Sequence, residues 1–493
     1  MSAAFTNPLL FVLVAVGCFS GVYIGAIPGL SGTMAVSILV SFTFGWKTET
    51  ALALMIGVFV GVVYGGSRSA ILLNIPGAPA AVATALDGYP LAKKGKAGYA
   101  MGIATTQSII GTAIGIAVLM FAAPLVAKIA LKFKSVDYLM LAFMGLMMVG
   151  SLGGKSIASG IIGGCIGLFL GCVGIDPQTA VKRFTFDIPY LNSGVHFVVA
   201  MIGLFGASEA FVQISDRGAK PVKQEIDKII PTFGESLKYI PLTLRSAVLG
   251  VVIGALPGAG GDIAALLAYD QAKRSVKNPA VPFGEGAVEG IVAPETANNA
   301  AIGGAFIPML TLGIPGDAIT AVLISALSIQ GIQVGPKFIQ QQPDMYWLII
   351  AFLWIGAVFL CIFGLTGIKL FAKVVEIPKG ILMPMILVLS VIGAFAIRNS
   401  LYDIFWMFGF GLIGYFLKKY DFPIAPVVLG SILITLFENN FRRGVLLAKG
   451  SVWKMFLSIF KSPISVLLFV AIVYLILSQT AAYKKLMAKL RKR

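Results

Sequence analysis

The chain has 493 residues, of which 58% are apolar and 12% are charged, and its mean hydropathy is +0.93. Soluble globular domains carry about a quarter charged residues, so these values exclude a soluble protein and indicate one that lies in a lipid bilayer. The formal charge of +17 does not indicate nucleic-acid binding, because the basic residues are spread over loops between apolar stretches, as the positive-inside rule predicts.

Apolar stretches recur from one end of the chain to the other. A helix that crosses the bilayer core needs about 20 apolar residues, and several stretches are shorter or interrupted by Gly and Pro, so we expect on the order of a dozen membrane segments. No Lys or Arg precedes Lys47, so the first stretch is expected to be a retained helix rather than a cleaved signal peptide. The clearest stretches are residues 9–27, 51–73, 98–123, 138–149, 157–173, 195–211, 347–368, 381–396, 404–417 and 466–477.

The cysteine and histidine pattern predicts no metal site. Cys18, Cys165, Cys172 and Cys361 lie singly in apolar segments, without the close pairing of metal ligands. His196 is the one histidine and has no second imidazole with which to share a metal. We therefore expect no cofactor, and Na⁺ as the one metal ion to consider.

The chain matches itself in chain order. Residues 21–32 resemble residues 250–261, and Ile75-Pro76-Gly77 repeats as Ile314-Pro315-Gly316. A weaker match pairs residues 127–176 with 372–421. The spacing between matched residues drifts slowly, from 229 (21 to 250) to 239 (76 to 315) and 245 (134 to 379), as a duplicated unit with small insertions would show.

This duplication predicts four parts. Residues 6–213 and 244–458 are the two membrane repeats, 214–243 is a basic cytoplasmic linker, and 459–493 is a C-terminal helix with a basic tail. Linker and tail are both basic and so share the cytoplasmic side, which requires an even number of crossings between them. The final helix has no partner in the first repeat, so each repeat has an odd number. Odd repeats have opposite orientations, the inverted-topology plan of many secondary transporters, and the uncharged N-terminus is then periplasmic.

Four Pro-Gly pairs interrupt apolar runs at corresponding places in the two repeats. They are Pro28-Gly29, Pro76-Gly77, Pro257-Gly258 and Pro315-Gly316. In lipid such a break is costly unless it lines an enclosed or watery space, so paired breaks point to a solute site between repeats. A helix beginning after each break would offer N-terminal amides to an anion, while unwound carbonyls suit Na⁺. Hinges, or close helix packing at glycine, are the alternative explanation.

Polar groups have been added in one repeat only. Residues 293–299, Ala-Pro-Glu-Thr-Ala-Asn-Asn, stand where the first repeat has the apolar run 54–60. Asn298 and Asn299 can donate to a carboxylate or offer oxygens to a cation. Glu295 is either a first-turn acid or a residue that couples transport to a cation.

Three further charged residues have two interpretations each. Arg68 either grips a carboxylate with its two-pronged guanidinium or reaches for the membrane surface. Asp262 and Asp317 each follow a break closely, where they either cap a half-helix or bind a cation. Capping is the more common use.

Three long motifs resemble those of the tripartite tricarboxylate transporter family, in its large membrane subunit of the TctA type. They span residues 64–98 (YGGSRSAILLNIPGAPAAVATALDGYPLAKKGKAG), 254–274 (GALPGAGGDIAALLAYDQAKR) and 289–316 (EGIVAPETANNAAIGGAFIPMLTLGIPG). The resemblance implies a bacterial inner-membrane carrier driven by a cation gradient. It also implies two partners, a small membrane subunit of the TctB type and a periplasmic solute-binding protein of the TctC type that delivers a carboxylate.

We thus expect an all-α polytopic membrane protein with two inverted-topology repeats, broken or re-entrant helices at the Pro-Gly motifs, and one extra C-terminal helix. Its expected function is cation-coupled import of small di- or tricarboxylates; the other hypotheses are a passive anion channel and an intramembrane serine enzyme using Ser67 or Ser69 with His196. The predicted cation-coupling residues are Asp262, Glu295, Asn298 and Asp317. The predicted substrate-binding residues are Ser31, Gly32, Ser67, Arg68, Ser69, Asn74, Pro76, Gly77, Gly258, Gly260, Gly261, Asn298, Asn299, Pro315 and Gly316.

Overall fold

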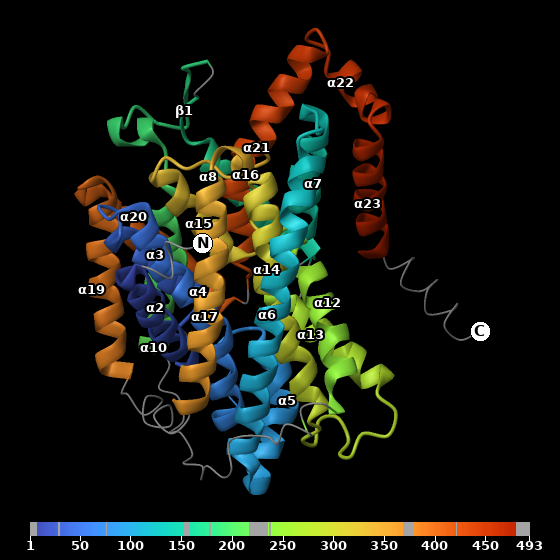
Figure 1. Cartoon of the computed structure of the whole chain (residues 1–493). Helices are drawn as coiled ribbons and strands as arrows, with labels where there is room; N and C mark the ends of the chain where they lie inside the picture. Colours follow the sequence, from blue (N-terminus) through green and yellow to red (C-terminus); the bar gives the residue numbers. More distant parts are fainter. Residues whose placement is uncertain are drawn as a thin grey trace. The chain divides into compact units, whose positions relative to one another are not determined.

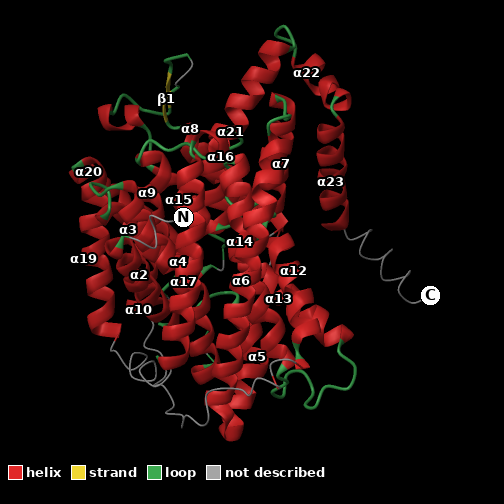
Figure 2. Ribbon diagram, viewed as in Figure 1, coloured by secondary structure: helices red, strands yellow, loops and turns green. Residues whose placement is uncertain are grey.

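The computed structural model describes residues 7–27, 30–74, 76–151, 157–176, 179–215, 235, 238–367, 379–420 and 422–479. Pro28-Gly29, most of the predicted linker and the basic C-terminal tail lie outside these residues, as do Ala372-Lys373 and Asp421 of the weaker repeat match. The described chain is almost entirely helical, with one two-stranded hairpin (Figure 2). The structure confirms the all-α membrane fold that the sequence predicts, with several apolar helices.

Four described helices are long and apolar enough to cross a membrane. They are Pro8–Ala26, Thr48–Leu72, Ala81–Ala130 and Pro343–Thr366, and a pair bent by 99°, Val452–Lys461 with Pro463–Tyr474, is a fifth if it counts as one span. Seven further apolar helices have 10–17 residues. Most of the apolar stretches picked out from the sequence lie within one described helix each, for example 98–123 within Ala97–Ala130 and 404–417 within Leu401–Lys419.

The chain forms two compact units, and each takes residues from both predicted repeats. Unit 1 is residues 1–127 with 198–416, and unit 2 is residues 128–197 with 417–493. The division therefore does not follow the predicted repeats, which are defined by sequence similarity.

Most of the helices that lie wholly or mainly in unit 1 are labelled in Figure 1. Their bounds are α2 Pro8–Ala26, α3 Gly32–Phe42, α4 Thr48–Leu73, α5 Ala81–Leu91, η1 Ala92–Lys96, α6 Ala97–Ala130, α9 Phe197–Met201, η3 Ile202–Ala207, α10 Ser208–Ser215, α12 Ile240–Gly254, α13 Gly260–Ser275, α14 Glu289–Leu312, α15 Ala318–Ile329, α16 Phe338–Gln341, α17 Pro343–Thr366, α19 Lys379–Arg398 and α20 Leu401–Lys419. A core of buried apolar side chains from α4–α6 and α12–α14 joins the first repeat to the second.

Helices α2 and α4 are in backbone contact along a ladder of glycines. A Cβ atom on Gly17 would collide with the carbonyl of Leu54, and one on Gly25 with that of Val62. Residue numbers rise together along the contact, so α2 and α4 run parallel. Because two parallel helices are joined here through α3, the chain must return through α3 to the end at which α2 began. Small residues at such contacts allow the close approach that holds helices together in membranes.

Helices α12 and α14 repeat this arrangement with the matching residues of the second repeat. A Cβ on Gly254 would collide with the carbonyl of Ala301, as one on Gly25 would with Val62, its equivalent. Residue numbers again rise together, so α12 and α14 are parallel and α13 returns the chain between them. In contrast, α4 and α14 run antiparallel, because Ser67 contacts Glu295 whereas Phe59 packs on Phe306.

Unit 2 consists of α7 Ser135–Ser151, α8 Ile157–Cys172, strands β1 Gly174–Ile175 and β2 Lys182–Arg183, η2 Pro189–Ser193, α21 Ala425–Leu447, α22 Val452–Ser458, η4 Ile459–Lys461 and α23 Pro463–Gln479. Strands β1 and β2 pair antiparallel, with Gly174 opposite Arg183. Helices α8 and α21 meet through Gly167, which lies against the backbone of Val427. The carboxylate of Asp137 at the start of α7 accepts hydrogen bonds from Ser462 and Ser465, which fixes the start of α23.

Candidate functional site

Two of the predicted Pro-Gly breaks end long helices in the same way. Helix α4 is capped by Asn74, with φ 57° and ψ 26°, and α14 by Gly313, with φ 71° and ψ 24°. These residues occupy matching positions in the two repeats. Left-handed geometry is what terminates a helix here, and Asn and Gly are the residues that adopt it at least cost. Pro76 and Pro315 follow shortly, where they cannot continue the helix.

The glycine after each proline is packed against backbone. The amide of Gly77 donates to the carbonyl of Gly66 at 3.2 Å, and a Cβ on Gly77 would collide with the carbonyl of Gly25. In the second repeat a Cβ on Gly316 would meet the carbonyl of Gly254 and the Cα of Ala305, the equivalents of Gly25 and Gly66. The broken chain thus closes onto its own repeat, so any larger residue at either glycine would displace the backbone.

The break between α12 and α13 lies against the break that precedes α15. Gly258 and Gly260 have φ of 78° and 59°, which only glycine adopts easily. A Cβ on Gly260 would meet the side chain of Asp317, and one on Gly261 would collide with Oδ1 of Asn298. The structure therefore brings this predicted site segment against the break that precedes α15.

Contacts between the repeats complete this arrangement. Gly32, at the start of α3, lies against Ile319 of α15. The amide of Ala80, which begins the turn into α5, donates to Asp262 of α13 at 3.0 Å. All of these residues belong to unit 1. Of the four predicted breaks, the three that the structure describes are thus linked through close contacts, and Pro28-Gly29 lies outside the described residues.

Asp262 and Asp317 make capping contacts. Asp317 is the N-cap of α15, accepting from the amide of Thr320 at 2.7 Å in a reciprocal capping box. Asp262 caps a helix of the other repeat, since its carboxylate accepts from the amide of Ala80 just before α5. Ser31 caps α3 by accepting from the amide of Met34 at 3.1 Å. Helix α13, whose N-cap position is Ala259, has no side-chain cap.

Glu295 is the centre of a buried polar cluster. Its Oε1 accepts hydrogen bonds from Ser67 of α4, at 2.6 Å, and from Thr84 of α5. Its Oε2 accepts from Ser108 of α6 at 2.9 Å. Glu295 lies near the first turns of α14 yet is only 1% exposed, so it is no solvated first-turn acid. Helices α4, α5 and α6 of the first repeat thus each donate a hydrogen bond to one carboxylate of the second repeat.

The two predicted asparagines have different neighbours. Nδ2 of Asn298 donates to the carbonyl of Val63 in α4 at 3.1 Å. Nδ2 of Asn299 donates to Ser108 at 2.9 Å and to the carbonyl of Glu295 at 3.0 Å. Asn298 therefore joins α14 to the first repeat beside Gly261, whereas Asn299 belongs to the Glu295 cluster.

Arg68 is buried in α4 and directed toward α17. Its guanidinium donates to the hydroxyl of Tyr64 and to the carbonyl of Gly364, and it lies 4.7 Å from the centre of the Tyr64 ring. At 1% exposure it does not reach the surface of the chain. Arg68 is thus adjacent in sequence to the Glu295 cluster, with its described contacts on another side of α4.

The two serines considered as nucleophiles have other hydrogen-bond partners. The hydroxyl of Ser67 donates to Glu295, and that of Ser69 donates to the carbonyl of Gly66 at 3.3 Å. A serine nucleophile needs a base that accepts its proton, usually an imidazole. Neither of these two hydrogen bonds is to an imidazole.

The sequence analysis did not identify several residues of this site. Thr84 and Ser108 bind Glu295, and Gln107 accepts from Thr243 at 2.8 Å and from Thr296 at 3.1 Å. The run Thr105–Ser108 interrupts an apolar helix, and polar groups inside a membrane segment are functional candidates by default, so a signal was present. Thr84 lies among small residues and gave no comparable signal.

Asp87 was also missed, and it fastens the loop between α13 and α14. Its Oδ1 accepts from the amides of Gly284, Gly286 and Ala287 at 2.8–2.9 Å, and its Oδ2 accepts from Tyr269 at 2.9 Å. A carboxylate that accepts several amide hydrogens is a strong anchor. Asp87 of the first repeat thereby fixes the position at which α14 begins, and with it the position of Glu295 on that helix.

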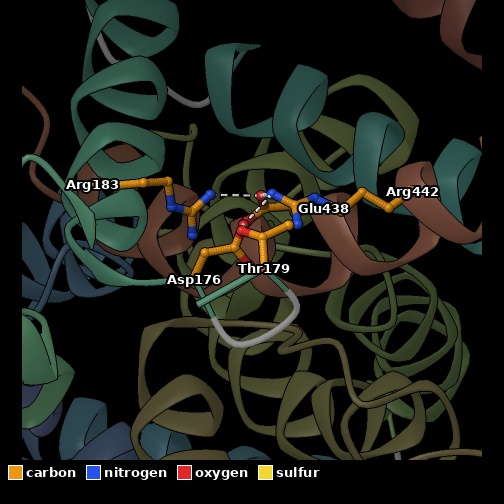
Figure 3. Close-up of polar contacts among 5 residues, drawn as sticks. All are labelled: Asp176, Thr179, Arg183, Glu438 and Arg442. Carbon is orange, nitrogen blue, oxygen red and sulfur yellow. Dashed lines mark hydrogen bonds and ion pairs between the residues drawn. The ribbon is translucent and has the colours of Figure 1, made fainter. Parts of the chain in front are cut away.

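Unit 2 contains a separate charged cluster, which includes none of the predicted site residues (Figure 3). Glu438 of α21 binds Arg183 of β2 at 2.6 Å and Arg442 of its own helix at 2.5 Å. Arg442 also binds Asp176 at 2.7 Å, and Thr179 donates to Asp176. Two arginines against two acids make this cluster neutral, and it attaches the hairpin to α21.

Comparisons with known proteins agree with the motifs. A model of the "Tripartite tricarboxylate transporter TctA family" matches residues 11–429. An "Uncharacterized 52.8 kDa protein in TAR-I ttuC' 3'region" of Agrobacterium vitis is 36% identical over 447 residues, which cover 90% of this chain and 88% of that protein. An "Uncharacterized protein in TAR-II ttuC' 3'region" of the same organism is 41% identical over 201 residues, 41% of this chain and 83% of that protein. No solved structure matches.

We predict that Asp87→Ala loosens the loop between α13 and α14. Because three buried donors and one partly buried donor lose their acceptor, the change should cost about 3 kcal/mol or more, and trypsin should cut at Lys277 faster than in the unaltered protein. Asp270→Ala is the control, since Asp270 is 52% exposed and pairs with Arg274 one turn away. Equal cleavage rates for the two variants would contradict the anchoring role.

Proposed function

This chain belongs to the tripartite tricarboxylate transporter TctA family, and on that premise we propose that it imports small di- or tricarboxylates by secondary active transport, coupled to Na⁺ or H⁺ and dependent on a solute-binding protein. The chain is a multi-pass membrane protein of a transporter family. The single observation that carries the proposal is the meeting of the described breaks in unit 1, where Gly260, Asp317, Asp262 and Ala80 are in contact.

The proposed substrate seat lies among the starts of the half-helices. An amide-rich helix start attracts an anion, and α13 has no side chain that already caps it. Asn298 lies next to this start, with Nδ2 on Val63 and Oδ1 against Gly261. Nδ2 of Asn298 carries a second hydrogen besides the one on Val63, and a carboxylate bound near the start of α13 would accept it, which supports the predicted substrate-binding set.

We further propose that the two halves are inverted-topology repeats with re-entrant helices at the breaks. The matching collisions of Gly25 with Val62 and of Gly254 with Ala301 support duplication. The antiparallel contact of α4 with α14 supports opposite orientation, because equivalent helices of a direct repeat would run the same way. The returning paths of α3 and α13 support re-entrant segments.

Coupling is assigned to the four polar residues that the sequence analysis selected. Glu295 has the strongest support, because it is buried and is held by three hydroxyls. Asp262, Asp317 and Asn298 lie around the break at Gly260-Gly261. Capping by the two aspartates is compatible with coupling, since a cation that competes for either carboxylate would release a half-helix start.

The proposed setting is the bacterial inner membrane, with the C-terminus cytoplasmic and the N-terminus periplasmic. The proposed partners are a small membrane subunit of the TctB type and a periplasmic binding protein of the TctC type. The family's description as tripartite supports partners of this kind. A catalytic role is not proposed, because the family to which the chain belongs is a transporter family.

The first expected outcome is uptake of labelled tricarboxylate or dicarboxylate into proteoliposomes that contain this chain and its small subunit. Uptake should require the binding protein and a Na⁺ or H⁺ gradient. Uptake that is indifferent to both gradients would contradict coupling, and currents far above carrier turnover would favour a passive channel.

Asn298→Ala and Asn299→Ala should abolish most uptake at normal membrane abundance. Each loses a buried amide that bridges helices, a change expected to lower transport about tenfold to a hundredfold. The control is Thr106→Ala, because among the described residues the Thr106 hydroxyl bonds only to the carbonyl of Gly102 in its own helix, at 2.9 Å. Normal uptake by both asparagine variants would remove them from the site.

Arg68→Ala should weaken uptake or change the ratio of tricarboxylate to dicarboxylate transported. Arg68→Lys tests the geometry, since lysine keeps the charge but lacks the guanidinium fork. A shifted ratio in both variants supports a carboxylate clamp. An unchanged ratio in properly inserted protein would assign Arg68 to joining α4 and α17.

A further inference from the structure

The Glu295 cluster is built from oxygen atoms of four helices. Ser67, Thr84 and Ser108 come from α4, α5 and α6, and Glu295 comes from α14. Glu295, Ser67, Thr84 and Ser108 are each at most 1% exposed. Two hydroxyls share Oε1 of Glu295 and the third is on Oε2, so the carboxylate accepts on both oxygens.

Asn299 adds an amide oxygen to the cluster. Its Nδ2 donates to Ser108 and to the carbonyl of Glu295, while Oδ1 has no hydrogen-bond partner among the residues that the structure describes. The residue is fully buried. An unpaired amide oxygen inside a protein is costly and calls for an explanation, such as an ion that binds it.

We propose that this cluster is the Na⁺ site of the carrier, in which Glu295 supplies the negative charge and Ser67, Thr84, Ser108 and Oδ1 of Asn299 supply neutral oxygens. The inference rests on the proposed transport function and names its coupling ion. It assigns Ser67 and Asn299 to the cation rather than to the carboxylate, and it adds Thr84 and Ser108, which the sequence analysis did not select.

The chemistry of the donors fits a monovalent hard cation. Hydroxyl, amide and carboxylate oxygens are the ligands that hard cations prefer, and each hydroxyl can turn its hydrogen away to present a lone pair. Divalent ions are usually held by several carboxylates, and no group of three acidic, histidine or cysteine side chains with metal-site geometry occurs among the described residues. A proton would need only one oxygen of Glu295, whereas the hydroxyls from three helices converge on both of its oxygens.

The position of the cluster explains how an ion there would act on the substrate seat. Ser67 adjoins Gly66, whose carbonyl accepts from Gly77 in the first repeat's break at 3.2 Å. Thr84 lies in the first turn of α5, just after that break. A cation held by Ser67, Thr84 and Glu295 would tie both sides of the break to α14. Sodium binding would thereby fix the helix starts that the carboxylate needs.

The test measures sodium binding directly on the full chain purified in detergent. Thermal unfolding is followed by tryptophan fluorescence in NaCl and in choline chloride at equal ionic strength. We expect Na⁺ to raise the midpoint in a saturable way, Glu295→Gln to remove this response, and Thr84→Val to raise the half-saturating Na⁺ concentration about tenfold. Ser67→Ala is a second ligand variant that needs little repacking and should shift the response in the same direction.

Thr112→Val is the matched control for Thr84→Val. Thr112 is a fully buried threonine of α6 whose hydroxyl, within the part of the chain that the structure describes, bonds only to the carbonyl of Ser108, so its variant should keep the wild-type sodium response. A normal response in Thr84→Val and Ser67→Ala would overturn the proposal. So would a wild-type midpoint that ignores Na⁺ but responds to pH through Glu295, which would make the cluster a proton site. A cluster-dependent sodium response without carboxylate uptake would instead leave the site in place and contradict the transport function.

Discussion

Backbone amides and carbonyls that leave a helix inside an apolar environment must find new partners, and this constraint governs the centre of unit 1. Glycine meets it by allowing backbone to approach backbone. The amide of Gly77 bonds to Gly66, and Gly316 lies against Gly254 and Ala305. Side chains cap two of the other helix starts, Ser31 within its own segment and Asp262 from the opposite repeat, whereas the start of α13 has no side-chain cap.

The two repeats share a backbone plan but differ in what fills it. The glycine contacts of α2 with α4 recur between α12 and α14. The polar side chains do not recur, because Glu295 and Asn299 stand on α14 while the hydroxyls that bind Glu295 come from the first repeat. Such a division makes the polar cluster depend on both repeats. It also explains why a site can be unique in a molecule whose scaffold is duplicated.

Much of the helical framework could be predicted from the sequence, because apolar length and Pro-Gly spacing act locally. The ends of α4 and α14 follow from Asn74, Gly313 and the prolines beyond them. Glu295 was a candidate because an acid in an apolar context has few harmless roles. Its partners could not be predicted, since Thr84 and Ser108 are distant in sequence and hydroxyls in helices usually bond to their own backbone. Asp87 was missed for a similar reason, because the backbone amides that donate to its carboxylate lie in a loop of the other repeat.

Unit 1 contains residues of both repeats, and this limits the motion by which a carrier of this kind could expose its substrate. Ser67, Thr84, Ser108 and Glu295 all lie in unit 1, although they come from both repeats. Rocking one repeat against the other would have to break their hydrogen bonds, together with that of Ala80 to Asp262. Displacing unit 1 as a rigid body would break none of them. An elevator-like movement of the whole unit therefore keeps the hydrogen bonds that a rocking movement between the repeats would break.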